Sequence, residues 1–210
     1  MKGRLLIWML FSTATGFAGE HMSVAVCNIG VLPAQVIEHA EAEAAYVFRA
    51  MGVEVHWTSC AAEVDAADVR MRPDFIVRVR VCGHIAKAGP ASLAAMGRAF
   101  MDPGGVGDMA DVYYGAIQEL TLLFPFAGAD QVMGYTMAHE LGHLLIGEGH
   151  RPSGLMRAAW SKTELDALNH RQLKFNDVER AVIVRMLRSR AAASIAGSKA
   201  TSGRNSALAP

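Results

Sequence analysis

Two histidines four residues apart, His139 and His143, are the residues whose spacing most clearly predicts chemistry. On a helix, positions i and i+4 lie on one face, so both imidazoles can reach a single Zn²⁺ ion. Glu140 is offset by one position, which leaves it free to accept a proton from a water at the ion. The segment therefore predicts a helical zinc site with Glu140 as the general base.

The third zinc ligand is predicted from the residues that follow this pair. Gly147 and Gly149 can end the helix with left-handed backbone angles, so the chain can turn back and present His150 to the same ion. Three histidines leave the fourth position of a tetrahedral zinc for water, as a catalytic site requires. Three carboxylates remain alternatives to His150, namely Glu148, Glu164 and Glu179.

Residues 139–156, HELGHLLIGEGHRPSGLM, resemble the signature of the metzincins, a clan of zinc endopeptidases. The run is most similar to matrixin-type catalytic domains and related secreted bacterial proteins. The resemblance implies one catalytic Zn²⁺, a polypeptide substrate and a Met turn that forms a hydrophobic floor under the metal. It implies that the zinc ligands are His139, His143 and His150. It also implies that Glu140 is the general base and Met156 the turn methionine.

The spacing departs from the common metzincin pattern by one residue. That pattern is HExxHxxGxxH, whereas here the glycine and the third histidine each come one position later, at Gly147 and His150. An extra helical residue rotates the exit of the helix by about 100°. Ile146 must therefore be accommodated by a longer helix or a looser turn. The departure motivates an alternative function, a catalytically inactive secreted zinc-binding or interaction module.

Two weaker candidate sites precede the histidines. By resemblance, residues 105–114 are expected to form an edge strand that pairs with an extended substrate, and its candidate residues are Gly105, Val106, Gly107, Tyr113 and Tyr114. The two tyrosines are also candidates for transition-state donors, with plain packing as the alternative. In the turn DPGGVGD, Asp102 and Asp108 are candidate oxygen ligands for Ca²⁺, and an ordinary turn is the alternative.

The elements that must position these residues follow from the spacing of apolar side chains. Alternation predicts strands at residues 23–29, 53–57 and 74–82, and a further strand at 110–117 near a sheet edge. Helical spacing predicts helices at residues 33–51, 130–146 and 177–190. This order indicates an α/β (α+β) domain with some parallel pairing. The resemblance implies a metzincin-like twisted mixed sheet, a long helix, an active-site helix, the Met turn and a C-terminal helix.

The first 18 residues have the three-part pattern of a secretory signal peptide. Lys2 and Arg4 precede the apolar run 5–11, and Gly16 and Ala18 supply the small residues of a cleavage site. The apolar run is too short to span a bilayer, which takes about 20 residues. We therefore expect a secreted or periplasmic protein with a signal peptide at 1–18, a single zinc metallopeptidase-like domain at 19–190 and a disordered tail at 191–210.

Composition and cysteine usage narrow the classes of function further. Basic and acidic residues number 20 each among 210, so no basic excess favours nucleic acid, and no membrane span is expected in the mature protein. The three cysteines lack C-x-x-C spacing, which disfavours a cysteine zinc site. A Cys60–Cys82 disulfide is geometrically possible because each residue ends a predicted strand, and Cys27 resembles a buried free thiol. The odd number of cysteines leaves the pairing open.

Overall fold

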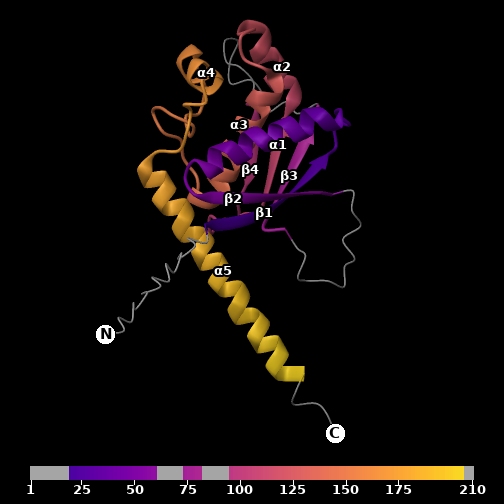
Figure 1. Ribbon diagram of the computed structural model, residues 1–210, viewed down its shortest axis with the longest axis vertical. Helices are drawn as coiled ribbons and strands as arrows, with labels where there is room; N and C mark the ends of the chain where they lie inside the picture. The colour runs from indigo at the N-terminus through magenta and orange to yellow at the C-terminus, as the bar shows by residue number, and fades with distance from the viewer. Residues whose placement is uncertain (1–18, 61–72, 82–94, 206–210) are drawn as a thin grey trace, which may run out of the picture.

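The described residues contain one mixed sheet of five strands, in the order β2-β1-β3-β5-β4 (Figure 1). This computed structural model describes residues 19–60, 73–81 and 95–205, so the expected signal peptide lies outside the described residues. Neighbouring strands are parallel except for β4, which runs antiparallel to β5. The strands are β1 Glu20–Asn28, β2 Val53–Ser59, β3 Phe75–Arg80, β4 Gly97–Phe100 and β5 Met109–Tyr113.

Helices α1, Ala34–Arg49, and α3, Ala129–Ile146, pack against each other and against the sheet. The crossing is close at Gly134, where an added Cβ would lie 2.4 Å from the carbonyl oxygen of Ala40. Beneath the helices lie the apolar side chains of the strands, including the fully buried Phe75 and Val77. This packing fixes α3, which carries the HELGH residues, relative to the sheet.

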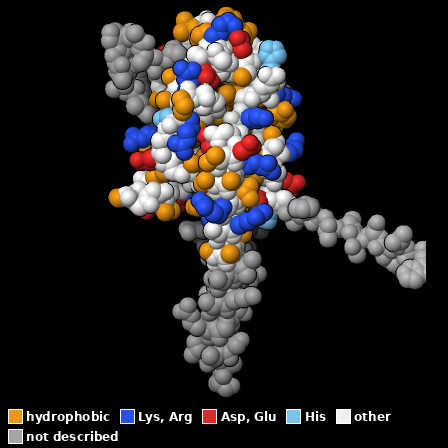
Figure 2. Space-filling view, turned by 90° about the vertical axis from the view of Figure 1, so that its left-hand side faces the viewer, with side chains coloured by type: hydrophobic (Ala, Val, Ile, Leu, Met, Phe, Trp, Pro, Cys, Tyr) orange, Lys and Arg blue, Asp and Glu red, His pale blue; other side chains and the backbone are white. Residues whose placement is uncertain are grey.

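Three further helices complete the described chain: α2 Tyr114–Leu123, α4 Lys162–Asn169 and α5 Asp177–Asn205. Arg188 of α5 pairs with Glu20 at the start of β1 at 2.7 Å, and beyond this contact the helix projects past the sheet (Figure 1). Basic and acidic side chains are interspersed on the face viewed in Figure 2, in keeping with the balanced composition. None of the helices within the described ranges is long and apolar enough to cross a membrane.

The predicted order of strands and helices is confirmed, with four differences. Helices α2 and α4 were not predicted, and the strand expected at 110–117 ends at Tyr113, where α2 begins. The predicted edge strand is wrong, because β5 lies between β3 and β4, and the short β4 forms the edge. Helix α5 continues through residues 191–205, where a disordered tail was expected; the alanines at 191–193 are strong helix formers that extend it.

The predicted pairing of the cysteines is corrected by the structure. Cys27 and Cys60 form a disulfide with their Cα atoms 4.9 Å apart, so Cys27 is not a free thiol and Cys60 is not available to Cys82. The reason lies in the parallel register of β1 and β2, where Val26 is opposite Ser59 and the next residues face each other. Cys82 itself lies outside the described residues.

Candidate metal centre

Three histidines from α3 and the loop that follows it converge on one point. The Nε2 atom of His143 lies 3.1 Å from Nε2 of His139 and 3.3 Å from Nε2 of His150. Zn–N bonds of 2.0–2.1 Å in a tetrahedral site separate two ligand nitrogens by about 3.3 Å. These two separations match that geometry, and all three ligand atoms lie within 4.8 Å of one another.

The protonation of the first two histidines also suits a metal ion. Nδ1 of His139 lies 2.7 Å from the carbonyl oxygen of Leu155, and Nδ1 of His143 lies 3.3 Å from that of Gly147. A carbonyl oxygen only accepts, so each Nδ1 carries the proton and each Nε2 presents a lone pair.

Burial keeps these two imidazoles uncharged at neutral pH. It lowers the pKa of His139 to about 4 and also lowers the pKa of His143. Two lone pairs 3.1 Å apart without a proton between them repel each other, and a cation placed between them removes that repulsion. The donor set therefore fits a zinc ion.

The extra residue in the histidine motif is accommodated by a longer helix. α3 continues to Ile146, and Gly147 ends it with φ 97° while its N–H donates to the carbonyl of His143 at 2.8 Å. Gly149 also has a positive φ, 102°, as the sequence predicted for both glycines. These two conformations return the chain toward α3, so His150 reaches the first two histidines despite the changed spacing.

The three carboxylates that were alternatives to His150 as third ligand do not join the histidine group. Two of them bind other residues, and the third lies beside the group. Glu164 accepts hydrogen bonds from Arg157 and from Ser161 in the first turn of α4. Glu179 accepts from the backbone N–H of Asn176 at the start of α5. Glu148 lines the cleft beside the histidines but does not belong to the converging group.

Met156 lies beneath the histidine-bearing helix. Its side chain is buried, and a Cβ added at Gly142 would lie 2.8 Å from its sulfur atom. The backbone N–H of Arg151 donates to the Met156 carbonyl at 2.8 Å, which closes the loop that carries His150. The glycine of HELGH thus allows the methionine turn to approach the helix directly under the candidate ligands.

Glu140 lies between α3 and the edge strand β4. The Ala99 N–H donates to its carboxylate, and burial raises its pKa to about 8. A bound dication opposes such a shift by favouring the carboxylate. Gly97 leaves the room that the side chain occupies, because an added Cβ would lie 2.5 Å from Oε1 of Glu140. Nothing in the sequence pattern indicates Gly97 as a site residue, since its role arises only from the contact of β4 with α3.

Two hollows meet at this group and form a cleft. One, of about 330 Å³, extends past Met101 and Glu148. The other, of about 130 Å³, is lined by Arg157 and Trp160. Both hollows are bordered by Gly97, Glu140 and His150. The candidate metal centre therefore lies in the middle of an open groove along the edge of the sheet.

The other predicted site residues do not join the centre in the expected way. Gly105, Val106 and Gly107 lie in the loop between β4 and β5, Tyr113 is buried at the end of β5, and Tyr114 begins α2. The carboxylate of Asp102 accepts N–H bonds from Gly104 at 2.8 Å and Val106 at 2.9 Å, as in an ordinary turn. Calcium binding at Asp102 and Asp108 is not supported.

A five-stranded mixed sheet with the histidine-bearing helix α3 above the turn at Met156 is a metzincin-like fold. No protein-family model and no curated protein matches the sequence. Among solved structures, the chain is similar to archaemetzincin from Methanopyrus kandleri, with TM-score 0.50 and 18% identity over 81% of this chain and 98% of that one. It is also similar to metalloproteinase-II from Bacteroides fragilis, with TM-score 0.49 and 13% identity over 80% of this chain and 53% of that one.

Proposed function

We propose that the protein is a zinc-dependent endopeptidase. One observation carries the proposal: the three converging Nε2 atoms lie beside the buried Glu140 in a groove along the edge strand β4. Zinc held by His139, His143 and His150 would supply a Lewis acid and an activated water. The fold and the three-histidine group support a metallopeptidase, and the structure similar over 81% of this chain is an archaemetzincin by name.

Glu140 is the group that moves protons in this proposal. Its carboxylate takes a proton from the nucleophilic water and returns it to the amine that leaves when the peptide bond breaks. The Nδ1 hydrogen bonds of His139 and His143 orient the two rings, so that their Nε2 atoms hold the metal. The arrangement requires no covalent intermediate with the protein.

The edge strand β4 orients the substrate. The N–H of Tyr113 donates to the carbonyl of Met96 at 2.7 Å, so Arg98 and Phe100 also direct their backbone groups toward β5 in the antiparallel ladder. The backbone groups of Gly97 and Ala99 then point away from the sheet. The Ala99 N–H already donates to Glu140. An extended polypeptide can pair with the backbone groups of Gly97 and the carbonyl of Ala99, which would place its backbone across the metal site.

We also propose that the protein acts outside the cytoplasm. The pattern of residues 1–18 supports export. The disulfide between Cys27 and Cys60 supports it independently, because disulfides persist in oxidising compartments.

Hydrolysis of a mixed fluorogenic peptide library tests the proposed reaction. We expect the protein to cleave peptides, to lose cleavage when a chelator removes the metal, and to regain it when one equivalent of Zn²⁺ is added. Cleavage that persists without metal would contradict the proposal. Folded, zinc-loaded protein that cleaves nothing would favour the inactive binding module that the altered spacing motivated.

Replacing Gly97 with alanine is expected to impair catalysis without removing the metal. The new Cβ would lie within 2.5–2.8 Å of three side-chain atoms of Glu140 and must displace the carboxylate. A shift of about 1 Å at a catalytic group costs up to about a hundredfold in rate, so we expect kcat/KM to fall by about that factor. The measurement is steady-state kinetics together with zinc content.

Gly104→Ala is the matched control for this substitution. It makes the same chemical change in the loop that follows β4, where the nearest atom is an oxygen of the exposed Asp102 at 3.2 Å. Its kcat/KM is expected to stay at the wild-type value. Unchanged kinetics in Gly97→Ala would show that Glu140 is not held against β4 during the reaction.

A further inference from the structure

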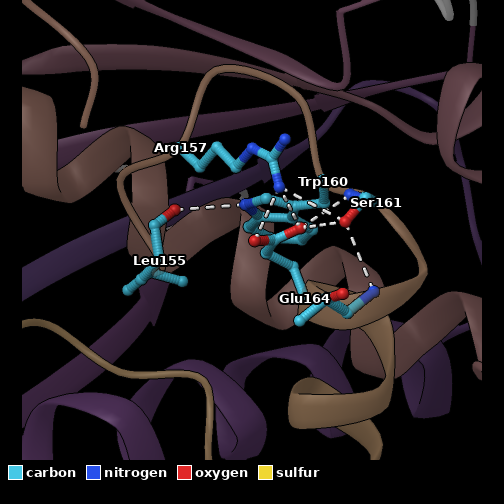
Figure 3. Close-up of polar contacts among 6 residues, drawn as sticks. Leu155, Arg157, Trp160, Ser161 and Glu164 are labelled. Atoms are coloured by element: carbon cyan, nitrogen blue, oxygen red, sulfur yellow. Dashed lines mark hydrogen bonds and ion pairs between the residues drawn. The ribbon is translucent and has the colours of Figure 1, made fainter. Parts of the chain in front are cut away.

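The carbonyl oxygen of Leu155 accepts two hydrogen bonds, and one of them comes from a candidate metal ligand. Nδ1 of His139 donates to it at 2.7 Å. The indole Nε1–H of Trp160 donates to the same oxygen at 3.1 Å (Figure 3). A carbonyl oxygen has two lone pairs, so these two donors use its full capacity. His139 and Trp160 therefore both hold the Leu155 carbonyl in the direction in which it points.

Trp160 is itself firmly placed. Only 4% of its surface is exposed, and its ring meets that of His139 edge to face, with centroids 6.0 Å apart. The tryptophan is followed by Ser161, whose N–H donates to Glu164 at 2.8 Å. Arg157 donates to the same carboxylate at 2.7 Å (Figure 3). The chain on both sides of Trp160 is thereby tied to the start of α4.

We propose that Trp160 is a positioning residue for the metal centre, acting on His139 through the Leu155 carbonyl. The indole N–H holds the oxygen in the direction that keeps Nδ1 of His139 protonated and Nε2 free. Outer contacts of this kind set the tautomer and ring orientation of metal-binding histidines. The inference rests on the proposed zinc site and adds a residue that makes no contact with the metal.

The second candidate ligand, His143, provides a comparison for how firmly His139 is oriented. Nδ1 of His143 lies 3.3 Å from its acceptor, the carbonyl of Gly147, compared with 2.7 Å for His139. Hydrogen bonds of 2.7 Å are near the short end of the normal range and those of 3.3 Å beyond it. His139 is therefore the ligand with the more strongly defined orientation, and Trp160 shares its acceptor.

Zinc affinity of Trp160→Phe, measured by competition with a chelator, tests the proposal. Loss of an outer hydrogen bond typically lowers metal affinity 10- to 100-fold, and we expect a loss of at least about tenfold. The visible spectrum of the Co²⁺-substituted protein is expected to change as well, because it reports on the geometry of the ligands. Far-UV circular dichroism and the thermal unfolding midpoint establish that each variant is folded.

Trp57→Phe is the matched control. Trp57 lies in β2, at the edge of the sheet opposite β4, and its Nε1 is buried without a hydrogen-bond partner among the described residues. The substitution removes the same N–H from the same side chain. We expect wild-type zinc affinity and an unchanged Co²⁺ spectrum.

A second replacement separates the hydrogen bond from the packing of the ring. β-(3-Benzothienyl)alanine at position 160 keeps the bicyclic shape and replaces the N–H with sulfur, so it decides the question if Trp160→Phe does not fold. We expect it to lose zinc affinity as well. Wild-type affinity in this protein, or in Trp160→Phe, would overturn the proposal, and so would an equal loss in Trp57→Phe. Wild-type protein that binds no zinc would instead contradict the proposed function.

Discussion

Glu140→Gln is expected to lower kcat by about a thousandfold while one zinc ion per chain stays bound. Glutamine has the shape of glutamate, and its side-chain oxygen can still accept the N–H of Ala99. It cannot take a proton from water, and general acid–base catalysis contributes about 10²–10⁴ in rate. The substitution leaves the three proposed ligands, His139, His143 and His150, unchanged. Peptide hydrolysis and metal analysis on the same preparation measure both quantities.

The thermal unfolding midpoint of metal-free Glu140→Gln, compared with that of metal-free wild type, shows independently whether the variant is folded. Burial raises the pKa of Glu140 above its ordinary value of 4.5, to about 8. A carboxyl with a raised pKa in the folded protein destabilises that state as the pH rises above 4.5, and the cost grows until about pH 8. Glutamine removes this cost, so the unfolding midpoint at pH 7 is expected to equal or exceed that of wild type.

Glu148→Gln is the matched control for the loss of activity. Glu148 lines the same cleft, and its replacement removes one carboxylate from the vicinity of the metal without touching Glu140. We expect near-normal kcat. A Glu140→Gln protein that retains near-wild-type rates would remove Glu140 from the mechanism, and a large loss in Glu148→Gln would indicate Glu148 as the base instead.

The sequence predicted the elements that carry the histidines because their apolar residues recur with clear periods. α3, predicted at 130–146, spans Ala129–Ile146, and β3 buries Phe75, Val77 and Val79 on one face, as alternation required. The HELGH motif is local, so its two histidines share a helix face whatever the rest of the fold does. Such features depend only on neighbours along the chain.

The errors arose where a contact depends on the order and register of strands. Cys27 pairs with Cys60 because β1 is directly beside β2 in parallel register, and strand ends alone do not specify that partner. The edge strand was misplaced because β4, Gly97–Phe100, has only four residues and no long apolar alternation. Gly97 and Trp160 belong to the site through contacts between distant segments, so their roles become visible only in three dimensions.

The altered spacing of the motif affects the position of His150 more than that of His139 or His143, because the extra residue lies directly before the loop that carries it. Its side chain is exposed, whereas His139 and His143 are each 7% exposed, and it is held near them by two glycines with positive φ. Its ring lies nearly perpendicular to that of His143, with centroids 4.8 Å apart, and its Nε2 points to the common centre. In the described part of the chain, two carboxylates line the same hollow, the proposed base Glu140 and Glu148.

His150→Ala is expected to weaken zinc binding by more than about a hundredfold, the upper end for the loss of an outer-shell partner. Hydrolysis at limiting zinc should disappear with the metal, because two histidines leave an incomplete set of protein ligands for a catalytic zinc. Glu148→Gln is expected to keep wild-type zinc affinity, since the three Nε2 atoms converge without it. Chelator competition measures both variants. The opposite result, zinc lost in Glu148→Gln and kept in His150→Ala, would assign the third ligand to the carboxylate and show that the extra residue redirects the loop.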